Sequence, residues 1–135
     1  MDNAGVYTLA AMQIGDPKPT ALVAMSPMPD LSGMSAVSLE ASLQYGSGGT
    51  SLTAIVVTSF DNGLTWRHIA RFDFGAAAAT RLANIQASGA KGVADYADLG
   101  AQGVNDGILG DRLALILSST GTYSNTTLSV RAAVR

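Results

Sequence analysis

The segment from residue 50 to residue 74 constrains the fold most, because it contains two strand-like runs joined by a turn. Residues 50–59 are rich in β-branched side chains, which favour extended backbone. Residues 66–74 alternate between apolar and polar side chains with a period of two, as a half-buried strand does. Between the runs, Asp61-Asn62-Gly63 supplies residues that tolerate the positive φ of a tight turn. The segment predicts a β-hairpin at the centre of the fold.

Further strand-like runs lie on both sides of this hairpin, and no long helical period interrupts them. Four runs share the alternation or the apolar content of strands: residues 37–45, 81–86, 113–118 and 128–134. The alanine run at residues 76–79 is too short to form a helix unaided. We therefore expect an all-β fold, an antiparallel β-sandwich with a jelly-roll-like arrangement, with a closed barrel as the alternative.

The first 34 residues differ in composition from the remainder. All four prolines and all five methionines of the protein lie there. We interpret residues 1–34 as an extended N-terminal arm with proline turns and a short strand at residues 21–25, followed by the sandwich domain at residues 35–135. Flexible thioether side chains suit irregular contact surfaces, so the arm predicts contacts with a partner through Met12, Met25, Pro27, Met28 and Met34. The alternative is that these methionines fill the core of the domain itself.

Composition limits the classes of function. The 135 residues are 47% hydrophobic and only 13% charged, which predicts one folded domain. A net charge of −2 without a basic run argues against binding to nucleic acid. The sequence has no cysteine and one histidine, so we expect no enzyme, no metal and no cofactor. We also expect no membrane span and no secretory signal, so the protein stays in the cytoplasm or is carried out in a larger assembly. Low charge suits a surface that neighbours cover.

The sharpest motif is Ser59-Phe60-Asp61-Asn62-Gly63-Leu64-Thr65-Trp66, which resembles the Asp-box of sialidase-like propellers. In that family the motif stabilises a hairpin and lies away from the catalytic centre. The physical prediction is the same: Asp61 accepts hydrogen bonds from turn amides, Gly63 adopts a conformation that other residues resist, and Trp66 packs under the turn. The structural residues of this motif are Ser59, Asp61, Gly63, Thr65 and Trp66.

Two other groups of residues have structural interpretations. Asp61, Asp106 and Asp111 could be combined into a calcium site, but their spacing favours separate turn roles. His68 shares its strand register with Trp66, which predicts a partly buried packing residue rather than a catalytic base.

Several separated blocks of the sequence resemble a family of small structural proteins from the head and neck modules of tailed bacteriophages and prophages. The blocks are residues 49–74, Asp106-Gly107-Ile108-Leu109-Gly110-Asp111-Arg112-Leu113, Gly121-Thr122-Tyr123 and Thr127-Leu128-Ser129-Val130. The resemblance covers residues 35–135 and implies a virion component, made in the host cytoplasm. As its role we expect capsid decoration (cement), with the major capsid protein or other virion proteins as partners. We also expect a homo-oligomer, with a trimer preferred because a capsid lattice offers three-fold positions.

The same features fit two alternative functions. A head-to-tail or tail structural protein satisfies the same resemblance. A carbohydrate-binding β-sandwich is the competitor from another class, and it requires an exposed aromatic side chain such as Trp66 as a stacking platform.

Overall fold

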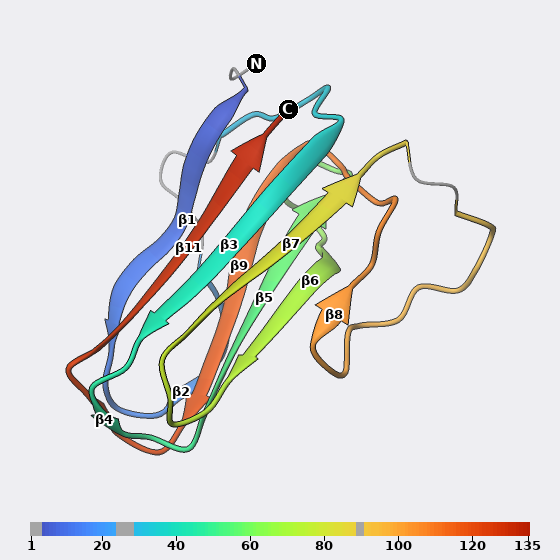
Figure 1. Ribbon diagram of the computed structural model, residues 1–135. Coiled ribbons are helices and arrows are strands. Elements are labelled where there is room, and N and C mark those ends of the chain that lie inside the picture. The colour runs from blue at the N-terminus through green and yellow to red at the C-terminus, as the bar shows by residue number, and fades with distance from the viewer. Residues whose placement is uncertain (1–3, 24–28, 89–90) are drawn as a thin grey trace.

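The protein, described here from a computed structural model at residues 4–23, 29–88 and 91–135, consists of two antiparallel sheets packed face to face (Figure 1). The first sheet has the order β1 (Gly5–Ile14), β11 (Thr126–Val134), β3 (Ala36–Gln44) and β7 (Ala79–Gln86). The second has the order β2 (Lys18–Val23), β9 (Arg112–Thr120), β5 (Ser51–Ser59), β6 (Arg67–Phe74) and β8 (Gly103–Val104). The short strands β4 (Ser47–Gly48) and β10 (Tyr123–Ser124) pair with each other. The described residues contain no helix, so none there is long and apolar enough to cross a membrane.

The order of the long strands is that of a jelly roll. With the short strands β4, β8 and β10 set aside, the first sheet contains long strands one, eight, three and six, and the second contains two, seven, four and five. Consecutive long strands lie in different sheets except for β5 and β6, which form the central hairpin. The predicted all-β antiparallel sandwich and its hairpin are confirmed, and the sheets do not close into a barrel.

The core lies between the two sheets and follows the period-two pattern of the sequence. On β3 the buried side chains are Val37, Leu39, Ala41 and Leu43, each separated by a more exposed residue. The facing sheet contributes Phe72 and Phe74 from β6, together with alternate residues of β5 and β9. Each large side chain that is fully buried here contributes about 1.5–3 kcal/mol to folding.

The outer face of the second sheet carries a small apolar cluster of its own. Ile55, Val57 and Ala114 are buried there, and the partly buried Trp66 and Ile116 pack against them. This explains why β5 is buried along nearly its whole length, as its run of β-branched residues predicts.

The N-terminal region is not the separate arm that its composition suggests. β1 pairs with β11 from Gly5 opposite Val134 to Ile14 opposite Thr126, and β2 pairs with β9. Leu9 and Ile14 belong to the common core, so the predicted domain boundary after residue 34 is wrong for the described residues. The predicted strand at residues 21–25 is found at Lys18–Val23.

The predicted contact residues of this region divide into two groups. Met12 is partly buried and packs against the core, and Met34 is buried within it, which favours the core-filling alternative for both. Met25, Pro27 and Met28 lie outside the described residues, so their role in partner contact stays a prediction.

Candidate functional site at the β5–β6 turn

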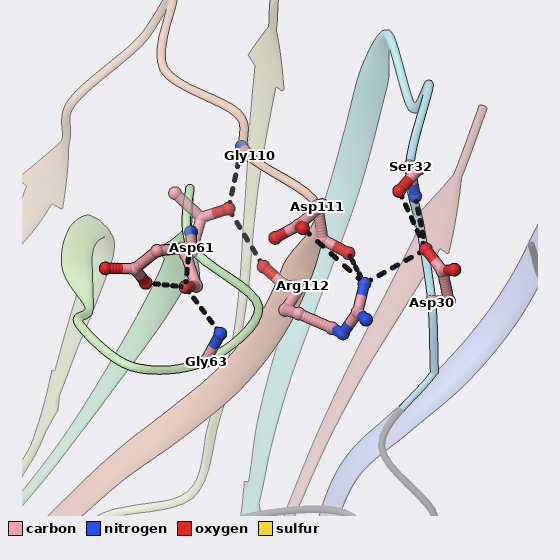
Figure 2. Close-up of polar contacts among 9 residues, drawn as sticks. Asp30, Ser32, Asp61, Gly63, Gly110, Asp111 and Arg112 are labelled. Carbon is pink, nitrogen blue, oxygen red and sulfur yellow. Dashed lines mark hydrogen bonds and ion pairs between the residues drawn. The ribbon is translucent and has the colours of Figure 1, made fainter.

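The turn between β5 and β6 is held by side-chain hydrogen bonds to its own backbone. The Ser59 hydroxyl donates to Asp61 Oδ1 at 2.8 Å and accepts from the N–H groups of Gly63 at 2.8 Å and Asp61 at 3.2 Å (Figure 2). The Asp61 carboxylate also accepts from Thr65, whose N–H lies 2.8 Å from Oδ1 and whose hydroxyl lies 2.7 Å from Oδ2. Four of the five residues that the motif predicts therefore meet in one hydrogen-bonded turn.

The backbone of this turn needs the residue types that the sequence supplies. Asn62 and Gly63 have φ of 59° and 92°, in the left-handed region that asparagine and glycine tolerate best. The hydroxyl and N–H of Thr65 and the Ser59 hydroxyl lower the pKa of Asp61 from 3.8 to about 2, so its carboxylate is ionised at neutral pH. The Ser59 hydroxyl is fully engaged. The arrangement fixes the shape of the turn.

Trp66, the fifth residue of the motif, packs on the apolar cluster of the outer sheet face. It is partly buried against Ile55, Val57 and Ala114. Part of its surface is thus used for packing within the protein, which leaves less of it for stacking on a sugar.

A second segment is fastened to the same turn from the end of the loop before β9. The Gly110 N–H donates to Thr58 Oγ1 at 2.9 Å, and the Thr58 hydroxyl donates to the Arg112 carbonyl at 2.9 Å (Figure 2). The Asp111 N–H donates to the Ser59 carbonyl at 2.7 Å. A Cβ at Gly110 would overlap this carbonyl, so only glycine allows the two backbones to approach so closely.

A third segment, just before β3, completes this end of the sandwich. Arg112 Nη1 lies 2.9 Å from Asp30 Oδ1, which also accepts from the N–H and hydroxyl of Ser32 (Figure 2). The pKa of Asp30 is lowered mainly by the hydrogen bond from the Ser32 hydroxyl, and to a smaller extent by the charge of Arg112. The Leu31 N–H donates to the Asp111 carbonyl at 2.9 Å. Three segments far apart in the sequence are therefore held together at one end of the fold.

Two large apolar side chains project from this braced turn. Phe60 is 61% exposed and Leu64 is 84% exposed. Both occupy variable positions of the motif, so the motif itself does not identify them as functional residues. The signal in the sequence that could have identified them is the presence of large apolar residues inside a polar turn. The turn therefore presents an apolar tip, Phe60 and Leu64, on a backbone that is already fixed.

His68 anchors the long loop that follows β7. Its ring Nδ1 accepts from the Leu99 N–H at 3.1 Å, and the backbone N–H of His68 donates to the Tyr96 hydroxyl at 2.8 Å. That hydroxyl donates in turn to Asp98 at 2.7 Å. The pKa of Tyr96 is raised, mainly because its side chain is partly buried. His68 thus holds the neighbouring loop in place, a positional role for a partly buried side chain.

The three aspartates considered as calcium ligands serve separate local structures. Asp106 accepts from the N–H groups of Gln86 and Gly107 at 2.8 Å, Asp61 holds its own turn, and Asp111 faces Arg112 at 3.7 Å. Within residues 4–23, 29–88 and 91–135 there is no group of three or more acidic or histidine side chains that could hold a metal ion.

Fold and turn define an all-β jelly-roll protein with a hydrogen-bonded, apolar-tipped hairpin. No protein-family model matches the sequence, and neither the curated proteins nor the solved structures contain a match.

Proposed function

We propose that the protein is a non-enzymatic structural component of a bacteriophage virion, and that it decorates the capsid as a cement protein bound to the major capsid protein. The observation that carries the proposal is the apolar tip of the β5–β6 turn. Burying Phe60 and Leu64 under a partner would contribute about 1.5–3 kcal/mol each. Because hydrogen bonds already fix the turn, binding loses little conformational entropy there.

The sequence resemblance supports a partner contact at the same end of the molecule. Residues 49–74 and 106–113, the two longest blocks that resemble phage head and neck proteins, supply the turn and the loop fastened to it (Figure 2). A jelly roll by itself does not choose between partners, because viral capsid and lectin domains both use it. The tip and the resemblance together favour a protein partner in a particle.

Binding to capsids of its own virion assembled without this protein tests the proposal. Replacing both Phe60 and Leu64 with serine should weaken binding at least about 100-fold, the equivalent of roughly 3 kcal/mol. Val6→Ser is the matched control, because Val6 is 66% exposed on the outer face of the other sheet. Equal binding by the double variant and the control would refute the role of the tip.

Electron microscopy of the particle separates shell decoration from the head-to-tail and tail alternatives. Density on the capsid shell supports decoration, whereas density at the neck or tail assigns the protein to those structures. Light scattering on the purified protein tests the expected trimer, and a stable dimer would contradict it.

A further inference from the structure

A second site is suggested by a cavity of about 290 Å³ at the edge of the sandwich, where β7 comes close to β8. Arg71, Arg81 and Gln102 supply its polar lining, and Phe72, Leu82 and Val104 supply apolar walls. Among the residues that the structure describes, no carboxylate lines it. Phe60 and Leu64, the tip of the β5–β6 turn, are not among its lining residues.

Arg81 is the unusual residue of this cavity. Its guanidinium lies 4.7 Å from the centre of the Phe74 ring, and its Nη1 is buried without a hydrogen-bond partner in the described part of the protein. Burying a cationic donor without a partner is costly, because it loses water and gains no acceptor. Neighbouring Arg71, by contrast, donates to Asp73 at 2.9 Å and to the Leu99 carbonyl at 2.9 Å. Arg81 thus lines the cavity as a cationic side chain with no carboxylate partner among the described residues, and one of its buried donors is left unpaired.

The rest of the lining also offers donors rather than acceptors. Gln102 uses its side-chain oxygen to accept from the Asp73 N–H at 3.0 Å, which leaves its amide nitrogen as the available donor. Arg71 is neutralised by Asp73, so Arg81 gives the cavity a net positive charge. An anion that only accepts hydrogen bonds satisfies this set.

We propose that the cavity binds a carboxylate carried on an apolar stem, the chemistry that a glutamate side chain or the carboxyl terminus of a polypeptide presents. The planar guanidinium of Arg81 pairs with both carboxylate oxygens, and Gln102 donates to one of them. The stem lies against Leu82 and Val104. This assignment is a property of the isolated protein and does not depend on the proposed role in a virion.

Titration of the labelled protein with hexanoate, followed by nuclear magnetic resonance, tests the assignment. Hexanoate should produce saturable shifts of the Gly103 and Val104 amides, which belong to residues that line the cavity. Hexanol, with the same stem and no charge, and inorganic phosphate, with charge and no stem, should each bind at least about tenfold more weakly.

Substitution of the arginine provides the second arm. Arg81→Gln keeps much of the length of the side chain, removes its charge and should weaken hexanoate binding at least about tenfold. Arg131→Gln is the matched control, because Arg131 is about half exposed on the outer face of the same sheet and its substitution removes the same charge. This control should leave the affinity unchanged.

Three results would overturn the proposal. The first is the absence of saturable shifts at Gly103 and Val104, and the second is equal binding of hexanoate by the Arg81 and Arg131 variants. The third is that hexanol or phosphate binds as tightly as hexanoate. If Arg81→Gln does not fold, the comparison of the three ligands on the unaltered protein still decides.

Discussion

Gly110→Ala should destabilise the protein strongly, because it separates the loop before β9 from the β5–β6 turn. The added Cβ would lie 2.5 Å from the Ser59 carbonyl carbon and 3.1 Å from the Phe60 nitrogen, and it would overlap the Ser59 carbonyl oxygen. Relief of that overlap breaks the hydrogen bonds that Gly110 and Asp111 donate, worth about 0.5–1.5 kcal/mol each. Overpacking strain adds about 1–3 kcal/mol. The total loss is about 2–6 kcal/mol.

Thermal unfolding followed by circular dichroism measures this loss. For a protein of this length 1 kcal/mol shifts the melting temperature by roughly 3–5 °C, so Gly110→Ala should melt at least about 6 °C lower. Gly100→Ala, in the loop before β8, is the control, because a Cβ there meets nothing within 4 Å. A Gly110→Ala variant that melts within about 2 °C of this control would refute the argument that close backbone approach braces the turn.

The same structure supports three further predictions. Trp66→Ala removes a partly buried side chain and should lower the free energy of unfolding by about 2 kcal/mol, roughly half the loss for a fully buried tryptophan. Binding to a glycan array should not change, and an unchanged melting temperature with lost glycan binding would contradict this. Because hydrogen bonds lower the pKa of Asp61 from 3.8 to about 2, its contribution to stability is present above about pH 4 and is lost as the pH falls toward 2. The melting temperature of Asp61→Asn should therefore depend less on pH over that interval. A pH dependence parallel to that of the unaltered protein would contradict this prediction. Deletion of residues 1–30 removes β1 and β2 and should abolish cooperative unfolding, whereas a sharp transition in the truncated protein would show that these strands are dispensable.

The strands that could be predicted from the sequence have either an uninterrupted alternation or a continuous run of apolar and β-branched residues. Residues 37–45 correspond to β3, and the hairpin corresponds to β5 and β6. β1 was missed because the pairing shifts between Thr8 and Ala10, so that adjacent Leu9 and Ala10 are both buried and the period of two is broken. The prolines before residue 21 predicted a turn, so the start of β2 at Lys18 was missed. Within the described sheets β2 pairs only with β9 and is an edge strand, where Pro19 is tolerated.

The residues of the candidate site could likewise be predicted only where a local sequence pattern identifies them. The residues from Ser59 to Thr65 were identified because they act on each other within one turn, where spacing in sequence determines spacing in structure. Gly110 and Arg112 reach that end of the fold only through the strand order, which no local pattern encodes. Arg81 had no distinguishing signal, because the aromatic ring beside it and the lack of an acceptor for its Nη1 among the described residues depend on packing of the two sheets.

The pairing of β1 with β11 has a consequence for how the protein is made. Among the described strands β1 is synthesised first, but its only neighbour within the described sheet is β11, which is synthesised last of them. Such pairing between distant parts of a sequence makes folding slow, and it delays completion of the core until translation has passed β11. Until then β1, with no charged residue between Gly5 and Ile14, is an uncovered apolar strand in the nascent polypeptide. Chaperone demand during synthesis should therefore concentrate on the first strand.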